Sequence, residues 1–172
     1  MARTVTFKGN PVTLEGPELK VGDKAPDFAC LKGLEVVTLA STPAKARLFS
    51  VVPSLDTAVC SAQTKKFDET IRELGDAVAC YTVSLDLPFA QGRFCTAEKI
   101  ATMQTLSDTH NHSFGKNWGV LISSGLPLPL LARAVFVVDR NGTITYAEYV
   151  SEITNHPNYD AALAALKKAA AS

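Results

Sequence analysis

The sequence predicts an α/β protein with a mixed sheet, and three features lead to this expectation. Two apolar runs of strand length, at residues 48–52 and 77–85, each precede a segment with helical periodicity. A hairpin pattern follows at residues 132–150, and an apolar stripe of helical spacing ends the chain. This order is typical of a layered domain in which helices cover a sheet with parallel and antiparallel strands.

The length and composition indicate one globular domain spanning residues 1–172. Hydrophobic residues make up 47% of the chain and charged residues 20%, which argues against a disordered protein. Lys+Arg and Asp+Glu both number 17, so a nucleic acid or an anionic membrane surface is not expected as a partner. Neither a transmembrane-length apolar run nor a signal-peptide core is recognisable, so we expect a cytoplasmic protein.

The first part of the chain is expected to be mostly extended. A β-hairpin is predicted over about residues 4–14, because strand-like runs flank Gly9-Asn10-Pro11. Residues 21–28 are expected to form a loop that leads into the main domain, and residues 36–39 a short strand. The apolar run 48–52 is expected to be a buried strand.

A helix is predicted from residue 58 to about residue 74. Four of its residues recur at helical spacing and share one face: Cys60, Phe67, Ile71 and Leu74. Asp56 or Thr57 is the expected N-cap, and Gly75 ends the helix. Cys60 therefore lies in the first turn, just after a strand, on the inward-facing side.

The second half of the chain continues the alternation. Residues 77–85 are expected to form another buried strand, and residues 96–103 a helix with Thr96 as its cap. Residues 132–138 and 143–150 flank a strong turn signal and predict a hairpin. The final helix is indicated by a stripe of apolar residues: Tyr159, Leu163, Leu166 and Ala170.

Among four cysteines, Cys60 has the position of a nucleophile. Unpaired N–H groups and the positive end of the helix dipole stabilise a thiolate in the first turn of a helix. Cys80 lies in an apolar strand and Cys30 follows Phe28-Ala29, so both are expected to be core residues, although either remains a possible partner of Cys60. No CxxC pair occurs, which argues against a zinc ribbon or a dithiol motif.

No metal site is expected. His110 and His112 stand two residues apart in a polar segment, and His156 precedes a proline. None of them pairs with a cysteine or a carboxylate at helical ligand spacing.

Two segments carry a resemblance to a known family. Pro53, Thr57 and Cys60 form a Pro-x-x-x-Thr-x-x-Cys pattern that resembles the active-site motif of the peroxiredoxins. The segment 86–95, which ends in Cys95, is similar to the resolving-cysteine segment of the thiol peroxidases, the atypical two-cysteine peroxiredoxins. The resemblance covers essentially the whole chain. It implies a single thioredoxin-like peroxiredoxin domain with an N-terminal hairpin.

The resemblance also implies roles for individual residues. Cys60 is the peroxidatic cysteine, which attacks a peroxide oxygen and becomes a sulfenic acid. Cys95 is the resolving cysteine, which condenses with it to form an intramolecular disulfide. Arg133 would stabilise the thiolate and polarise the peroxide, Thr57 would hold the peroxide in line, and Pro53 would shape the loop and shield the sulfur.

A disulfide needs Cα atoms within about 7 Å of each other. Because Cys60 faces inward from its helix and Cys95 lies on a separate segment, we expect both regions to unwind locally before the disulfide forms.

The implied function is reduction of hydrogen peroxide and organic hydroperoxides, with thioredoxin as the reductant, no cofactor, and a homodimer as the assembly. Three other functions remain open from the residues alone. The first is a redox sensor that uses the same disulfide as a switch, and the second is a thiol–disulfide oxidoreductase on the same fold. The third is a structural binding domain with an ordinary thiol. The apolar loop 126–131 near Arg133 suggests a preference for organic peroxides.

Overall fold

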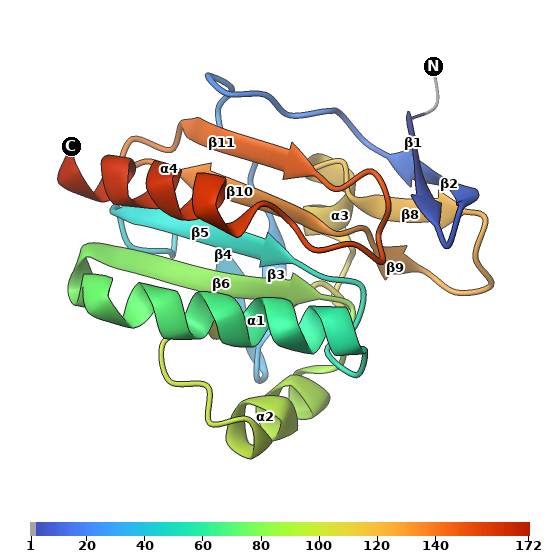
Figure 1. Ribbon diagram of the computed structural model, residues 1–172, viewed down its shortest axis with the longest axis horizontal. Helices are drawn as coiled ribbons and strands as arrows, with labels where there is room; N and C mark the ends of the chain where they lie inside the picture. The colour runs from blue at the N-terminus through green and yellow to red at the C-terminus, as the bar shows by residue number, and fades with distance from the viewer. Residues whose placement is uncertain (1–2) are drawn as a thin grey trace.

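The computed structural model describes residues 3–172, which form two β-sheets and their flanking helices (Figure 1). The strands of the larger sheet are β3 (Ala29–Lys32), β4 (Glu35–Thr38), β5 (Ala46–Val51), β6 (Val78–Ser84), β7 (Gln104–Ser107), β10 (Ala134–Val138) and β11 (Ile144–Tyr149). The strands of the smaller sheet are β1 (Arg3–Phe7), β2 (Asn10–Glu15), β8 (Leu121–Ser124) and β9 (Leu130–Leu131). The helices are α1 (Ala58–Ile71), α2 (Pro88–Ala97), α3 (Ser113–Asn117) and α4 (Tyr159–Ala171).

The larger sheet is mixed, as the sequence predicts. Its order is β11-β10-β5-β6-β7-β3-β4, with β5, β6 and β7 parallel and the remaining neighbours antiparallel. The α/β class and the thioredoxin-like arrangement are thereby confirmed. The predicted N-terminal hairpin is present as β1 and β2, and the late hairpin as β10 and β11.

Alternate residues of the central strand β5 point to opposite faces of the sheet, and each face has its own core. Leu48 packs with Phe67, Ile71 and Leu166, so α1 and α4 cover this face. Figure 1 shows these two helices side by side in front of the sheet. Phe49 belongs to a second core on the opposite face, which includes residues of α3 and of the smaller sheet.

The helix predicted over residues 96–103 is wrong in position. The structure has α2 at Pro88–Ala97 instead, followed by turns. Pro88 sits at the start of the helix, where its missing N–H group costs nothing and its fixed φ favours helical geometry. Lys99 then adopts a left-handed φ of 55°, which prevents the helix from continuing. Thr96 therefore lies at the end of a helix and caps none.

The first helix matches its prediction with two differences. α1 ends at Ile71, earlier than the predicted residue 74. A separate 3₁₀ segment, Arg72–Ala77, follows it and contains Gly75 at φ 50°. Thr57 is the N-cap, but within the described chain its side chain makes no capping hydrogen bond. Strands β3, β7, β8 and β9 and helix α3 were not predicted. No helix among residues 3–172 is long and apolar enough to cross a membrane.

Candidate active site

Cys60 lies in the first turn of α1 and is completely buried. The parallel strands β5 and β6 end on the same side of the molecule, and α1 begins there, a few residues after β5 (Figure 1). Val52 and Leu55 of the connecting loop pack around the cysteine, and half-buried Phe94 of α2 closes this small apolar cluster. The sulfur is thus shielded from water and lies near the positive end of the helix dipole.

Arg133 is the charged partner of this sulfur. It lies between β9 and β10, is only 3% exposed, and its Nη2 donates to the Cys60 Sγ at 3.4 Å. Its other donors are also fixed, since Nε donates to the Ile153 carbonyl at 2.7 Å and Nη1 to the Gln63 Oε1 at 2.9 Å. A buried guanidinium held at three points stabilises a thiolate more effectively than a mobile surface charge does.

Gln63 is a site residue that the sequence reading missed. It is fully buried one turn after Cys60, and its Nε2 donates to the Ser50 hydroxyl at 2.7 Å. The amide orientation follows from these partners, because Oε1 faces the Arg133 donor and Nε2 faces an acceptor. A polar residue three positions after Cys60, on the buried face of the helix, was the available signal.

Thr57 and Pro53 lie in the loop before α1, where the motif places them. The Thr57 hydroxyl donates to the Ser54 carbonyl at 2.8 Å, and the residue is exposed. Pro53 is buried between the end of β5 and this loop. The structure therefore brings Arg133 into contact with Cys60, whereas the hydroxyl of Thr57 is engaged with its own loop.

An open groove of about 520 Å³ runs along the start of α1. One wall is the loop and first turn of α1, and the other is the last part of α2. Its lining residues are Leu55, Asp56, Thr57, Ala58, Ser61, Arg93, Phe94, Ala97 and Glu98. A small substrate in this groove would be next to the apolar cluster that contains Cys60.

Cys95 lies in the last turn of α2 and is half-buried. Burial raises the pKa of its thiol above the ordinary value, although a hydrogen bond with the Thr105 side chain acts in the opposite direction. At neutral pH the thiol is therefore protonated in this arrangement, which makes it a poor nucleophile. All four cysteines are free thiols.

Asp86 anchors the beginning of α2 to the loop before α1. Its carboxylate accepts hydrogen bonds from the Ser54 hydroxyl at 2.8 Å, the Leu55 N–H at 2.8 Å and the Ser84 hydroxyl at 2.7 Å. The buried Gln91 adds a bond from its side chain to the Ser84 hydroxyl at 3.1 Å. Both cysteine-bearing segments thus start from one polar cluster.

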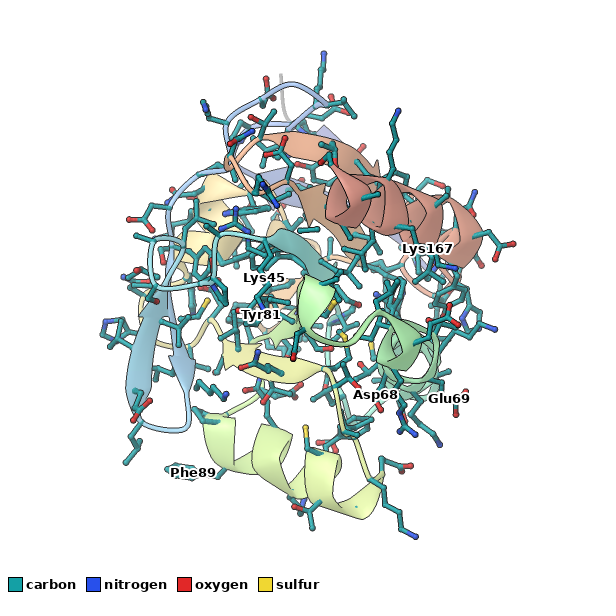
Figure 2. The ribbon with its side chains drawn as sticks, turned by 90° about the vertical axis from the view of Figure 1, so that its left-hand side faces the viewer. Lys45, Asp68, Glu69, Tyr81, Phe89 and Lys167 are labelled. Atoms are coloured by element: carbon teal, nitrogen blue, oxygen red, sulfur yellow. The ribbon has the colours of Figure 1, made fainter. Side chains whose placement is uncertain are left out.

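Asp68 anchors the chain that leaves α2. This buried carboxylate of α1 accepts from the backbone N–H groups of residues 101–103 and from Arg72. Burial alone would raise the pKa of Asp68, but these hydrogen bonds outweigh it and hold the pKa below its ordinary value. In Figure 2 Asp68 lies on the side of α1 nearest the chain leaving α2, whereas its neighbour Glu69 points outward.

Cys30 and Cys80 are core residues, as predicted. They belong to the two cores on opposite faces of the large sheet, and neither lies in the Cys60 cluster. Burial raises the pKa of the Cys80 thiol to about 12, and burial together with the neighbouring Asp108 raises that of Cys30 further. At neutral pH both thiols are therefore protonated in this fold, which makes them poor nucleophiles. Within residues 3–172 no group of three or more His, Cys, Asp or Glu side chains is arranged to hold a metal ion.

Comparison with known proteins gives consistent matches over nearly the whole chain. The model of the Redoxin family matches residues 20–163. The chain is 55% identical to a thiol peroxidase of Bacillus subtilis (strain 168), covering 95% of this chain and 96% of that protein. It is 50% identical to a thiol peroxidase of Streptococcus gordonii, covering 94% and 98% of the two chains.

Solved structures show the same arrangement of elements. A peroxiredoxin-like protein from Aquifex aeolicus superposes with a TM-score of 0.90 at 44% identity, covering 98% of each chain. A thiol peroxidase from Chromobacterium violaceum superposes with a TM-score of 0.84 over 96% of each chain, although only 17% of residues are identical. The second match concerns the fold alone.

Proposed function

The chain belongs to the thiol peroxidases of the redoxin, or peroxiredoxin, family, enzymes that reduce peroxides, and from this membership we propose that Cys60 is its peroxidatic cysteine and Cys95 its resolving cysteine. The observation that carries the proposal is the contact of 3.4 Å between the Arg133 guanidinium and the Cys60 sulfur at a helix N-terminus. Both features stabilise a thiolate. Residues 1–172 act as one peroxiredoxin domain that carries these groups.

The first step is attack of the Cys60 thiolate on one oxygen of a hydroperoxide. The S–O bond forms as the O–O bond breaks, so sulfur is oxidised to a sulfenic acid and the peroxide is reduced to an alcohol or water after taking up a proton. Arg133 donates to the oxygens, where negative charge develops during the step. This works without a cofactor or a metal.

Thr57 and Pro53 complete the substrate site. The exposed Thr57 hydroxyl borders the groove and keeps lone pairs that can accept a hydrogen bond from the peroxide. It thereby orients the peroxide for in-line attack. Pro53, buried behind the loop, shapes the backbone and keeps water from the sulfur. We assign substrate binding to Pro53, Thr57 and Arg133 together.

The second step joins Cys60 to Cys95. The Cys95 sulfur attacks the sulfenic sulfur, a disulfide forms, and one water molecule leaves. Because Cys60 is buried and Phe94 lies over its cluster, the first turn of α1 and the end of α2 must unwind locally. Unwinding also exposes the Cys95 thiol and removes the burial that raises its pKa.

The two anchors define the segment that unwinds. Asp86 holds the chain before α2, and Asp68 holds residues 101–103 after it. The bonds that cross between α1 and α2 within these limits are weak, since the Lys65–Glu98 and Arg93–Asp56 ion pairs are exposed. The end of α2 can therefore open while the buried Gln91 keeps its bonds to Ser84 and Leu106 and the sheet stays intact.

Reduction of the disulfide completes the cycle, and we assign this role to thioredoxin. Its dithiol gives two electrons and two protons to the Cys60–Cys95 disulfide and is itself oxidised to a disulfide. Reduced thiols persist in a reducing compartment, and we place the cycle in the cytoplasm.

A homodimer is the proposed assembly. Leu87 and Phe89 at the start of α2 are 58% and 68% exposed, and Figure 2 shows Phe89 projecting from this helix away from the sheet. Exposed large apolar side chains support a protein partner at this face. A two-fold pair is the commonest assembly of a single chain. Light scattering coupled to gel filtration tests this assembly.

The test of the peroxidatic site is a single-turnover oxidation. Wild type, Cys60→Ser and Arg133→Met are mixed with hydrogen peroxide, and sulfenic acid is trapped with dimedone. We expect no trapped product in Cys60→Ser and a rate lowered by about 100-fold in Arg133→Met, because a fixed donor to the developing charge is lost. The matched control is Arg140→Met in the exposed β10–β11 turn, which should oxidise at the wild-type rate. An unchanged rate in Arg133→Met would contradict the proposal.

A further inference from the structure

The carboxylate of Glu152 is a hydrogen-bond centre between the N-terminal hairpin and the segment after β11. Its Oε1 accepts from the Thr6 hydroxyl at 2.9 Å and from the Gly9 N–H at 2.8 Å. Its Oε2 accepts from the Lys8 N–H at 3.2 Å, from the Thr154 N–H at 2.9 Å and from the Thr154 hydroxyl at 2.7 Å. Five donors on one carboxylate exceed what the local turn of Glu152 requires.

The backbone conformation of the hairpin turn points two N–H groups at this carboxylate. Lys8 and Gly9 have φ values of 52° and 81°, so both are left-handed. A left-handed conformation is costly for lysine, and successive N–H groups in such a turn form a concavity that binds an anion. The Glu152 oxygens occupy this concavity, which explains why the turn persists with a non-glycine residue at its first position.

The backbone of the hairpin also forms hydrogen bonds with residues 151–153. The Thr6 N–H donates to the Ser151 carbonyl at 2.8 Å, and the Thr6 carbonyl accepts from the Ile153 N–H at 2.9 Å. The Ile153 side chain is 1% exposed and lies in the core beneath the hairpin. Ser151, Glu152 and Ile153 are thus held by backbone, carboxylate and packing at once.

Ile153 connects this cluster to the sulfur, because its carbonyl accepts the Arg133 Nε at 2.7 Å. The Gln63 side chain fixes Nη1, and these two contacts set the plane of the guanidinium. With both contacts in place, Nη2 points at the Cys60 Sγ. A shift of the Ile153 carbonyl would rotate the guanidinium about the contact with Gln63.

We propose that Glu152 is a positioning residue for peroxide reduction: by tying the N-terminal hairpin to Ile153, it sets the angle at which Arg133 meets the reacting atoms. The inference rests on the proposed role of Arg133. Hydrogen bonds from Thr154 and Gly9 lower the pKa of Glu152 to about 2, so its carboxylate is ionised throughout the working pH range. The hairpin thereby acts on a site to which it contributes no reacting group.

The test compares Glu152→Gln with a matched control, Glu148→Gln. Glu148 accepts bonds from the Tyr146 hydroxyl and the Asn158 N–H, and within residues 3–172 it has no hydrogen bond to the hairpin turn. Two rates are measured for the Cys60 thiol in each variant, oxidation by hydrogen peroxide and alkylation by iodoacetamide. Negative charge develops on an oxygen that Arg133 can stabilise only in the peroxide reaction, because alkylation by iodoacetamide releases iodide. The ratio of the two rates therefore reports how well the guanidinium is placed.

We expect the ratio of peroxide to iodoacetamide rates to fall about tenfold in Glu152→Gln, since small misplacements of a catalytic donor have effects of this order. Glu148→Gln should keep the wild-type ratio. Thr154→Val removes one hydroxyl donor to Glu152 and should lower the ratio by about twofold. This variant replaces Glu152→Gln in the test if Glu152→Gln does not fold. A wild-type ratio in a folded Glu152→Gln, or in Thr154→Val where Glu152→Gln does not fold, would overturn the inference.

Failure of the positioning role is distinguishable from failure of the proposed function. If Arg133→Met oxidises at the wild-type rate, the role of Arg133 is wrong and the inference falls with it. If Arg133→Met is slow while Glu152→Gln keeps the wild-type ratio, the peroxidatic site stands and only the role of Glu152 is overturned.

Discussion

Truncation of Phe94 should speed the formation of the Cys60–Cys95 disulfide. This side chain of α2 packs half-buried against the cluster of Val52, Leu55 and Cys60 and must leave before the cysteines can meet. Full burial of a phenylalanine is worth about 2–3 kcal/mol, so half burial contributes about 1–1.5 kcal/mol to the closed state. Phe94→Ala also favours the helical form of α2 by about 0.5 kcal/mol, which acts in the opposite direction.

The packing loss is the larger effect, so the balance favours opening by about 0.5–1 kcal/mol. Because 1.4 kcal/mol is tenfold, the open fraction and the resolution rate should rise by about two- to fivefold. The assay mixes reduced protein with one equivalent of hydrogen peroxide, quenches in acid, and follows the disulfide by mass spectrometry. Trapped sulfenic acid gives the rate of the first step separately.

Phe89→Ala is the control for this experiment. Phe89 lies on the same helix and is 68% exposed in the single chain, so its truncation makes the same change in helix propensity with little loss of packing within the protomer. Both variants are compared over a range of protein concentrations, which separates any effect that acts through the proposed dimer. It should resolve at the wild-type rate or slightly more slowly. A resolution rate in Phe94→Ala that equals or falls below that of Phe89→Ala would refute the argument that Phe94 limits opening.

Three further predictions concern the anchors and the remaining candidate residues. Asp68→Asn weakens the acceptor of three N–H groups at residues 101–103 and should lower the free energy of unfolding by about 2 kcal/mol in urea titrations at pH 7. Because the pKa of Asp68 is lowered on folding, its contribution is complete above the unfolded pKa of about 4 and shrinks at lower pH, where the two proteins should converge. Cys30→Ala and Cys80→Ala should retain thioredoxin-driven turnover within about twofold, since both thiols are buried in other cores, and a loss of turnover at constant stability would contradict their structural role. Leu128→Ser should slow the reduction of cumene hydroperoxide more than that of hydrogen peroxide if the apolar loop 126–131 binds organic groups. Equal effects on the two rates would exclude that role.

The elements with a strong local signal were the ones predictable from sequence. The buried strands β5 and β6, the helix that carries Cys60, both hairpins and the final helix all have apolar periodicity or a turn sequence of their own. Strand β7 and the strands of the smaller sheet that follow α3 have only two to four residues each. Their pairing depends on neighbours far away in the sequence, so no local pattern reveals them.

The misplaced helix shows how local cues can mislead. Thr96 followed by Glu98 resembles a helix start, but the stronger signal was Pro88, which begins α2 one turn after β6. What holds residues 101–103 out of a helix is the Asp68 carboxylate, which accepts their N–H groups from another element. That contact is tertiary, so the sequence around Thr96 does not contain it.

The site divides in the same way. Cys60 and its place in the first turn follow from the strand and helix patterns, whereas Arg133 was assigned through the family resemblance. The distance between them depends on how α1 packs onto the core of the large sheet, and Gln63 and the Ile153 carbonyl emerge only once that packing is known. Functional contacts between distant segments are the part of a site that one sequence conceals.

The most direct test of the two-cysteine cycle is peroxide consumption with thioredoxin, thioredoxin reductase and NADPH, comparing wild type with Cys60→Ser and Cys95→Ser. We predict sustained turnover by wild type, no reaction in Cys60→Ser, and a single oxidation without turnover in Cys95→Ser. Undiminished turnover in Cys95→Ser would contradict the two-cysteine cycle. A wild-type protein that oxidises once and then stops under these conditions would also contradict it and would favour a sensor or another reductant.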